Sequence, residues 1–326
     1  MFKVAVIGDT TWGKTLARLS AARGAVVSVW SRTESKAGEN RKEAMPKGGY
    51  HGQLSFTGDV REALKGADFV VCAVPAQRMR HNLKLSAPHM HSSAILISAA
   101  KGLEAETGKR MSEVIADEVK AVSPGMICAL SGPNLSGEIN QGLPATSVVA
   151  GSDLKVAGKI QELLDSPDFA VFISDDIVGV ELCGALKNVI AVGAGIMDGL
   201  ELGNNAKAAF ITLGWKDVVA LGTAMGARQD TFFGLAGLGD LIATGNSPLS
   251  RNHYVGCELG KGRVLSDIMK SMSQVAEGVD TAMAAHRLLK KAQLNAPIVD
   301  LVYRVLFESL PPAEISTRFK NGLKTD

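Results

Sequence analysis

One lysine stands inside an apolar stretch of small residues. The stretch ELCGALKNVIAVGAGIMDG covers Glu181–Gly199, and at helical spacing Cys183 and Lys187 share one face with two alanines. The opposite face is also apolar, so we expect a helix that is buried on nearly every side. Burial disfavours an ammonium ion and lowers its pKa towards neutrality, which suits a general acid or base. The alternative is a structural lysine paired with Glu181 or Asp198.

Three further stretches place polar side chains near turns. SAAKGLE and LSGPNLSGE each follow a strand-like run, and GLAGLGDLIATGNSPLSRN is rich in glycine. Arg251 and Asn252 together suit a phosphate, because a planar guanidinium fork lies beside an amide donor; a surface arginine is the alternative. With Asn188, the candidates are Lys101, Gly132, Asn134, Ser136, Asp240, Thr244, Ser250, Arg251 and Asn252.

The segment IGDTTWGKTLA resembles a dinucleotide-binding turn. The motif G-x-G-x-x-G is met by Gly8 and Gly13, but Thr10 stands at the second glycine, where the backbone approaches a pyrophosphate. The turn follows the first strand-like run and opens the first helix, which favours nucleotide binding. For Thr10 two outcomes are open: its bulk displaces the cofactor, or the loop shifts and its hydroxyl meets a phosphate oxygen. We expect a shifted loop with weakened affinity.

The end of the second strand-like run bears on the choice of cofactor. An NAD-preferring site carries an acid about 20 residues after the glycines, whereas this chain has Ser31, Arg32 and Thr33, with Glu34 following. Arg32 could hold a 2′-phosphate or stack on adenine, and the alternative is a solvated arginine. We therefore expect NADP or NAD as cofactor, with NADPH used.

The first half of the chain predicts a doubly wound sheet. Gly24 ends the first helix, and Asp59 with Glu62 predicts a capping box. Apolar strand-like runs alternate with helical segments, which is typical of a parallel sheet that is covered on both faces. The expected strands are Lys3–Ile7, Ala25–Trp30, Asp68–Pro75, Ala94–Ser98, Met126–Leu130 and Thr146–Gly151.

After Gly179 the strand pattern stops and helical patterns continue almost to the end. We therefore expect a Rossmann-type α/β domain over residues 1–178, followed by a mainly α-helical substrate-binding domain over 179–326. The expected helices of the second domain are Val180–Met197, Asn205–Met225, Val264–Met269, Thr281–Lys291 and Pro297–Glu308.

In this order, these residues resemble the NAD(P)-dependent glycerol-3-phosphate dehydrogenases, from Val4 to about Tyr303. The segments GVELCGALKNVIAVGAGIMDG and GLGDLIATGNSPLSRN are far more specific than the glycine turn. The resemblance implies interconversion of glycerol 3-phosphate and dihydroxyacetone phosphate, with Lys187 as the acid/base residue and with Lys101 and Asp240 as further catalytic residues. It also implies substrate contacts from Lys101, Asn134, Asp240, Ser250, Arg251 and Asn252. The implied cofactor contacts are Thr11, Trp12, Arg32, Lys101, Ser136, Arg251, Val275 and Glu277, besides the turn itself.

The chain departs from this family at three positions. Thr10 replaces the second glycine, Asn134 stands where bacterial members commonly have Ser or Thr, and Leu213 stands where arginine is common. Two alternative functions stay open. One is a related dehydrogenase of a 3-hydroxy acid or ketopantoate, and the other is an NADPH-sensing protein without turnover.

Composition limits the class of protein and of partner. Lysine plus arginine (35) nearly balances aspartate plus glutamate (33), which argues against nucleic acid as a partner. The four cysteines form no CxxC pair, and no leader or membrane-spanning run stands out, so we expect a cytoplasmic protein. The HMH sequence at residues 89–91 has no third ligand nearby, and we expect no metal. The resemblance implies a homodimer that supplies glycerol 3-phosphate for phospholipid synthesis.

Overall fold

The chain forms two compact units. The computed structural model describes residues 1–32, 34–43, 53–245, 247, 250–272, 274–315 and 317. The sheet unit comprises Met1–Ala100 and Arg110–Val180, and the helical unit comprises Lys101–Lys109 and Glu181–Asp326. The sequence predicts a single boundary between residues 178 and 179. The structure divides the chain two residues later and also assigns the short segment that begins with Lys101 to the helical unit.

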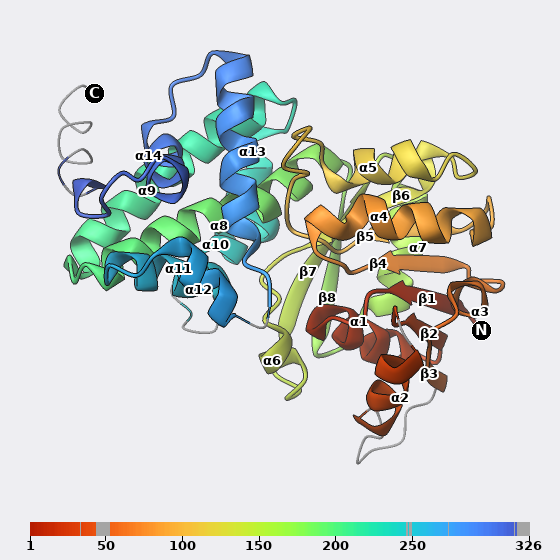
Figure 1. Ribbon diagram of the computed structural model, residues 1–326. Helices are drawn as coiled ribbons and strands as arrows, with labels where there is room; N and C mark the ends of the chain where they lie inside the picture. Colours follow the sequence, from red (N-terminus) through yellow and green to blue (C-terminus); the bar gives the residue numbers. More distant parts are fainter. Residues whose placement is uncertain are drawn as a thin grey trace. The chain divides into compact units, whose positions relative to one another are not determined.

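The sheet unit has eight strands in the order β3-β2-β1-β4-β5-β6-β7-β8 (Figure 1). The strands are β1 (Lys3–Ile7), β2 (Val26–Trp30), β3 (Gln53–Thr57), β4 (Phe69–Cys72), β5 (Ile95–Ser98), β6 (Ile127–Ser131), β7 (Ala145–Gly151) and β8 (Phe169–Ser174). The first six pair in parallel in the order typical of a Rossmann fold. The prediction of a doubly wound α/β fold is therefore confirmed.

Two features of the sheet differ from the sequence prediction. Strands β3 and β8 were not expected, and β7 runs antiparallel to β6, whereas β8 is parallel to β7. The connection from β6 to β7 contains only the four-residue helix α6 (Ser136–Ile139), in place of the longer crossover helix that usually joins parallel neighbours.

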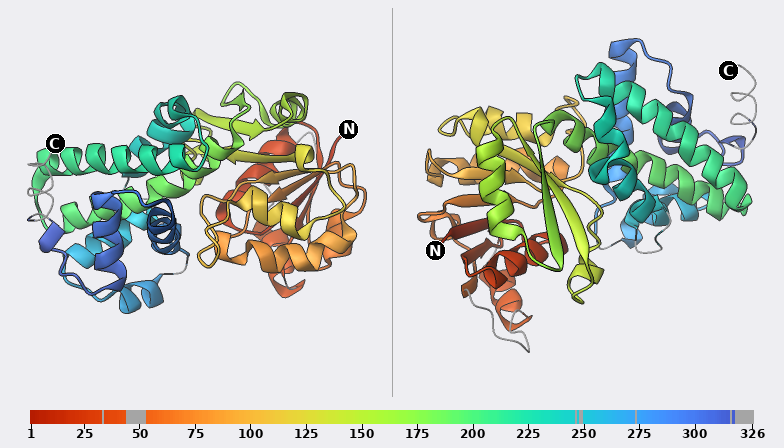
Figure 2. Two further views of the ribbon diagram at one scale, coloured as in Figure 1. Left: turned by 90° about the horizontal axis from the view of Figure 1, so that it is seen from above. Right: turned by 180° about the vertical axis from the view of Figure 1, so that it is seen from behind.

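Helices cover both faces of the sheet. They are α1 (Thr11–Ala22), α2 (Glu34–Glu43), α3 (Val60–Leu64), α4 (Ala76–Ser86), α5 (Met111–Glu118) and α7 (Leu154–Leu164), with short 3₁₀ turns η1 (Ala87–His89) and η2 (Pro124–Met126). Alternate residues of β1 point to opposite faces: Val4 and Val6 pack with α1 and α7, while Ala5 and Ile7 pack with α3, α4 and α5. Figure 2 shows these two helical layers around the sheet.

The caps of these helices follow the sequence in part. Asp59 caps α3 by accepting a hydrogen bond from the backbone N–H of Arg61. The expected capping box is wrong in its second half, because Glu62 accepts a hydrogen bond from the Thr57 hydroxyl. The backbone N–H of Asp59 donates to the Thr57 hydroxyl, which takes the place that the Glu62 carboxylate would have in a capping box.

The helical unit is built around α8 (Ile177–Gly199). Its other helices are α9 (Gly203–Ala224), α10 (Asp240–Gly245), α11 (Arg251–Gly260), α12 (Leu265–Ser271), α13 (Glu277–Ala292) and α14 (Pro297–Phe307), with η3 (Gln229–Phe233) and the π-helical turn η4 (Leu235–Gly239). By length and composition α8 could cross a membrane, but 89% of its apolar window is buried inside the structure, as in the core helix of a globular domain. Helices α10 and α11 were not expected from the sequence.

Glycines bring α8 and α11 into backbone contact. Gly195 and Gly199 recur at a spacing of four on α8, and Gly256 and Gly260 do the same on α11. A Cβ atom at Gly195 would lie 2.1 Å from the His253 carbonyl oxygen, and one at Gly256 would lie 1.9 Å from that of Val192. No larger residue fits without moving a helix, so this crossing fixes where α11 begins relative to the middle of α8.

We expect Gly256→Ala to destabilise the protein by about 1–3 kcal/mol, the usual cost of overpacking a tight core. The matched control is Gly158→Ala on α7, where an added Cβ meets nothing within 4 Å. The control should be neutral or more stable by about 0.5–1 kcal/mol, because alanine favours a helix over glycine. Urea unfolding of both variants is the measurement, and equal stability of the two would contradict the close crossing.

Candidate active site

The buried lysine predicted from the sequence lies in an ion pair. Lys187 is 3% exposed, and its ammonium donates to Oδ1 of Asp240 at 2.8 Å and to the hydroxyl of Thr244. Asp240 is itself only 2% exposed. The partner of Lys187 is therefore Asp240, 53 residues away along the chain, and not Glu181 or Asp198 as in the alternative interpretation.

A second lysine shares the same carboxylate. The Lys101 ammonium donates to Oδ2 of Asp240 at 2.8 Å, so each oxygen of this carboxylate accepts from one lysine. The structure brings Lys101, Lys187 and Asp240 together, with Thr244 on the next turn of α10. All four belong to the helical unit, and together they form the two-lysine centre.

Electrostatics tune the proton affinity of this centre. Burial is the main cause that lowers the pKa of Lys187 to about 8, with smaller lowering contributions from the charges of Lys101 and Arg251. The Asp240 carboxylate opposes them by stabilising the ammonium. Lys187 is thus mainly protonated at pH 7, yet its proton affinity lies within reach of physiological pH.

A π-helical turn sets the position of Asp240. Leu235–Gly239 winds as a π-helix, and Asp240 is the first residue of α10 immediately after it. A Cβ atom at Gly237 would lie 2.2 Å from the carbonyl oxygen of Phe232, so the turn packs backbone against backbone. Such turns occur often at functional sites. The glycine-rich sequence before Asp240 thus has a packing function.

Two asparagines hold the backbone around the centre. The side-chain amide of Asn188 donates to the Lys101 carbonyl at 2.9 Å, and Asn252 donates to Oδ1 of Asn188 at 2.8 Å. Asn252 also accepts the backbone N–H of Gly278, at the start of α13. One amide hydrogen and the side-chain carbonyl oxygen of Asn252 therefore already have partners. Its other amide hydrogen is the one that could reach a phosphate, as the sequence predicts.

The other candidates of the helical unit lie around the start of α11. Ser250 caps this helix by accepting from the His253 backbone N–H, and Arg251 is exposed and donates to the Val275 carbonyl at 2.8 Å. Val275 is 38% exposed. Glu277 is the first residue of α13, and one of its carboxylate oxygens is buried. The hydroxyl of Ser250 is thus used by the helix cap.

The glycine turn lies at the point where the strand order reverses, between β1 and β4. Gly8 has a φ of +113°, which only glycine adopts easily, and a Cβ at Gly13 would lie 2.1 Å from the Gly8 carbonyl oxygen. The first turn of α1 carries no acid, so its N-terminus is suited to an anion. This tight turn and helix end fit a dinucleotide pyrophosphate.

Thr10 takes a specific place in this turn. It is the N-cap of α1, and its hydroxyl accepts from the Gly13 N–H at 3.0 Å and donates to the Ala73 carbonyl at 2.8 Å. Its φ of −68° and ψ of 164° are ordinary for threonine. In this structure its single hydrogen bonds to the Ala73 carbonyl, so a hydrogen bond from its hydroxyl to a phosphate oxygen would require that bond to break.

The remaining predicted cofactor residues of the sheet unit lie near the ends of strands. Thr11 and Trp12 form the first turn of α1, and the indole N–H of Trp12 is buried without a hydrogen-bond partner among the described residues. Arg32 is exposed after β2, and Ser31 beside it is buried. Thr33 and the side chain of Glu34 lie outside the described part of the chain.

The turn after β6 holds three further candidates. Gly132 has a φ of +140°, Asn134 donates to the hydroxyl of Ser147 at 3.1 Å, and Ser136 opens α6. The side-chain carbonyl oxygen of Asn134 is buried and has no partner among the described residues. These three residues belong to the sheet unit, whereas the two-lysine centre belongs to the helical unit.

Histidines and cysteines take structural positions. His253 lies on α11 and its ring bonds Asp198 at 2.7 Å, while Lys207 bonds the same carboxylate. Among the described residues, no three His, Cys, Asp or Glu side chains are grouped as metal ligands would be. All four cysteines are free, and burial raises the pKa of Cys72 and of Cys128 to about 12.

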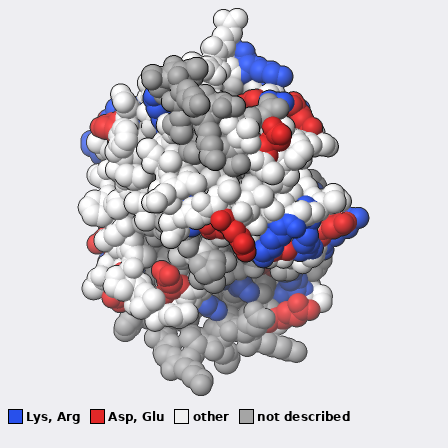
Figure 3. Space-filling view, turned by 90° about the vertical axis from the view of Figure 1, so that its left-hand side faces the viewer, with Lys and Arg blue, Asp and Glu red and all other residues white. Residues whose placement is uncertain are grey.

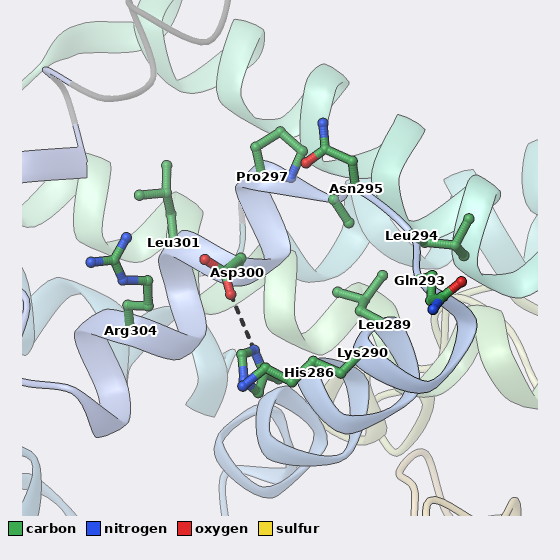
Figure 4. Close-up of a pocket in the computed structure, with 11 residues that line it drawn as sticks. His286, Leu289, Lys290, Gln293, Leu294, Asn295, Pro297, Asp300, Leu301 and Arg304 are labelled. Carbon is green, nitrogen blue, oxygen red and sulfur yellow. Dashed lines mark hydrogen bonds and ion pairs between the residues drawn. The ribbon is translucent and has the colours of Figure 1, made fainter.

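A separate hollow of about 360 Å³ lies between α13 and α14. Figure 4 shows His286 pointing towards Asp300, with a distance of 3.1 Å between Nδ1 and Oδ1, and His286 also stacks on Tyr303. No residue predicted for the site lines this hollow. Figure 3 shows basic and acidic side chains interspersed among the described residues of the face it presents.

Comparisons with known proteins identify the family. Residues 3–157 match the family model described as "NAD-dependent glycerol-3-phosphate dehydrogenase N-terminus", and residues 176–317 match its "C-terminus". The chain belongs to the NAD-dependent glycerol-3-phosphate dehydrogenase family. These matches confirm the resemblance inferred from the sequence motifs. Members of this family are oxidoreductases.

Similar proteins cover nearly the whole chain. A glycerol-3-phosphate dehydrogenase [NAD(P)+] of Dehalococcoides mccartyi is 50% identical over 324 residues, which cover 98% of this chain and 90% of that protein. The crystal structure of glycerol-3-phosphate dehydrogenase from Coxiella burnetii has a TM-score of 0.90 and 30% identity over 98% of both chains. A ketopantoate reductase from Ralstonia eutropha, at 12% identity and a TM-score of 0.62, shares the fold alone.

We expect Asp240→Ala to destabilise this dehydrogenase by about 3–5 kcal/mol at pH 7, the usual cost of leaving a buried charge unpaired. The pKa of Lys187 would then fall further, because the carboxylate that raises it is gone. A lysine whose folded pKa lies below its unfolded pKa destabilises the fold less as pH rises between the two values. Urea unfolding at pH 7 and pH 9 should therefore show part of the loss recovered at pH 9.

The double variant Asp240→Ala with Lys187→Met is the control for this prediction. It removes the unpaired ammonium together with the carboxylate, so it should be more stable at pH 7 than Asp240→Ala alone. A double variant that is less stable by the sum of the two single losses would show that the ion pair is energetically unimportant.

Proposed function

We propose that this protein interconverts sn-glycerol 3-phosphate and dihydroxyacetone phosphate by hydride transfer with NADP or NAD, and that Lys187 is the general acid/base. The observation that carries the proposal is the two-lysine centre. One carboxylate holds two ammonium groups, and burial brings the pKa of one of them to about 8. This centre lies in a chain of the glycerol-3-phosphate dehydrogenase family.

The proton chemistry follows from the contacts of Lys187. The reduced nicotinamide supplies a hydride to the carbonyl carbon when it is bound. The carbonyl oxygen then needs a proton, which the Lys187 ammonium can give, and in the oxidative direction the neutral amine takes it back. Two of the three N–H bonds of Lys187 point to Asp240 and Thr244, which leaves the third for the substrate oxygen. Lys101 adds positive charge beside the same oxygen.

Phosphate recognition is assigned to the start of α11. Arg251 is exposed and uses one N–H on the Val275 carbonyl, and its charge is close enough to lower the pKa of Lys187. A guanidinium offers up to five donors in a planar fork, which suits phosphate oxygens. Gly132 and Asn134 are proposed as substrate contacts from the sheet unit, and Asn188 and Asn252 as residues that hold the centre in place.

Cofactor binding is assigned mainly to the sheet unit. The turn around Gly8 and Gly13 and the N-terminus of α1 would hold the pyrophosphate, with Ser136 and Glu277 as further contacts. Arg32 is exposed at the end of β2, where it can meet a 2′-phosphate. We therefore propose NADPH use at least as efficient as NADH use.

The alternative functions have less support. A ketopantoate or 3-hydroxy acid dehydrogenase would have no use for a guanidinium placed for phosphate, and the ketopantoate reductase compared above shares only the fold. A sensing protein without turnover would not need a lysine with a pKa near neutrality in contact with the carboxylate of a second lysine. Both alternatives predict no consumption of NADPH with dihydroxyacetone phosphate.

The cellular setting is also part of the proposal. Four free cysteines, three of them buried, suit a reducing compartment, so we infer that the protein acts in the cytoplasm. We infer that it works as a homodimer on a small phosphorylated substrate and supplies glycerol 3-phosphate for phospholipid synthesis.

We expect the protein to oxidise NADPH when dihydroxyacetone phosphate is added, and Lys187→Met to lower kcat about 100-fold or more, because a general acid is lost. The measurement is the decrease in absorbance of the reduced nicotinamide. The variant should still bind NADPH in a calorimetric titration. A variant that kept its kcat while KM rose would assign Lys187 to binding alone.

The pH dependence of the wild type tests the same role with a definite sign. Reduction needs the ammonium, so its rate should fall as pH rises through about 8; oxidation needs the amine and should rise over the same range. Lys187→Met should lose this dependence in both directions. Parallel pH profiles for the two directions would contradict the assignment.

For the phosphate contact, we expect Arg251→Ala to lower kcat/KM for dihydroxyacetone phosphate by about 10- to 100-fold, the equivalent of a lost charge-assisted hydrogen bond. Unphosphorylated dihydroxyacetone should be an equally poor substrate for the variant and the wild type. Arg263→Ala is the matched control, since Arg263 lies beyond the other end of α11 and pairs with Glu258. An equal loss of kcat/KM with dihydroxyacetone phosphate and with dihydroxyacetone would show that Arg251 does not contact the phosphate.

A further inference from the structure

Thr10 is the residue of the dinucleotide-binding turn that the family pattern does not explain. It stands where the motif has its second glycine, and its side chain is expected to crowd the pyrophosphate and weaken binding. In the structure its backbone is unstrained, and its hydroxyl has two partners within the sheet unit. These contacts give Thr10 a role that a glycine cannot supply.

The hydroxyl joins two segments that meet at the reversal of strand order. Ala73 follows β4, and its N–H donates to the carbonyl of Ile7 at 2.9 Å, which continues the pairing of β1 with β4. Its carbonyl then accepts the Thr10 hydroxyl at 2.8 Å. The end of β4 is thereby tied to the first turn of α1, across the point where such sheets bind nucleotides.

The same hydroxyl orders the helix end. It accepts the Gly13 N–H, one of the donors that an α-helix leaves without an internal partner. The hydroxyl's only hydrogen already bonds Ala73, so none is left to donate to a phosphate oxygen. Because a hydroxyl has one hydrogen, Thr10 cannot donate to Ala73 and to a phosphate oxygen at the same time.

Gly8 and Gly13 converge on the same anchor. A Cβ atom at Gly8 would lie 2.8 Å from the Ala73 carbonyl oxygen, and one at Gly13 would lie 3.2 Å from the Ala73 side chain. The two motif glycines allow this close approach, and Thr10 bonds the carbonyl that they approach. All three maintain one local geometry: the distance from the end of β4 to the N-terminus of α1.

We propose that Thr10 is a positioning residue for the cofactor: its hydroxyl locks the turn to Ala73 and so orients the N-terminus of α1 towards the pyrophosphate, without touching the phosphate itself. The inference rests on the proposed function in one respect, that a nicotinamide dinucleotide is the ligand of this turn. The proposed role requires a side chain at position 10 that donates one hydrogen bond, to Ala73, and accepts another, from Gly13.

The test compares Thr10→Val, Thr10→Ser and Thr10→Gly in the full-length protein. Valine keeps the shape and removes the hydroxyl, so the Kd for NADPH should rise about 10-fold, as expected for the loss of two hydrogen bonds that hold the turn. Serine keeps the hydroxyl and should stay within about twofold of the wild type. Glycine should bind more weakly than serine. Calorimetric titration gives these constants.

Hydrogen exchange of the ligand-free protein separates positioning from direct contact. Thr10→Val should speed exchange of the Gly13 amide before any cofactor is added, and Thr10→Ser should restore the wild-type rate. The matched control is Thr15→Val on the same helix, which removes the hydroxyl that bonds Thr11 and Asn140. It should lower stability while leaving the Kd for NADPH unchanged.

Several results would overturn the inference. They are a wild-type Kd for Thr10→Val, tighter binding by Thr10→Gly, weaker binding with unchanged exchange at Gly13, and an equal rise in Kd for Thr15→Val. Each of these leaves the proposed function intact as long as the wild type binds NADPH. Failure of the wild type to bind NADPH would overturn the proposed function, and this inference with it.

Discussion

The site in the helical unit depends on one carboxylate that two ammonium groups share. Asp240 is nearly inaccessible to solvent, and each of its oxygens accepts from a different lysine. Removing a charge from water costs several kcal/mol, so Lys187 can remain buried and charged only with such a partner. The balance is close, because burial still outweighs the carboxylate and leaves the pKa of Lys187 at about 8. A fully compensated lysine would hold its proton too tightly to return it.

The surrounding structure serves to hold this balance. The π-helical turn presents Asp240, and Asn188 fixes the backbone of Lys101 because its amide donates to the Lys101 carbonyl as well as to that of Gly184. Asn252 then connects Asn188 to the start of α13. Residues that sequence motifs group as substrate contacts thus divide into those that carry charge and those that hold the charged groups in place.

Much of the fold was predictable because its signals are local. The buried runs of β1 and β4 and the apolar pattern of α8 follow directly from neighbouring residues. The orientation of β7 does not, since an apolar run has no direction and only the short α6 connection hints at it. Strand β3 was missed because its sequence, QLSFT, alternates polar and apolar residues at the edge of the sheet and lacks a long apolar run.

In the candidate site, Lys187 was conspicuous as a charge in an apolar helix, whereas its partner could not be found, since contacts between distant segments leave no mark in one sequence. The contact of the Thr10 hydroxyl was not found for the same reason, because it meets the carbonyl of Ala73, 63 residues away.

The glycine crossing of α8 and α11 has a consequence for substrate choice. Lys187 lies on one of these helices and Arg251 begins the other, and their backbones touch at Gly195 and Gly256. The crossing therefore fixes the spacing between the backbones that carry Lys187 and Arg251. This spacing is set by main-chain contact, which side-chain repacking cannot adjust. Under the proposed roles of Lys187 and Arg251, a variant that accepts a longer phosphorylated substrate would have to change this helix crossing as well as the side chains around the site.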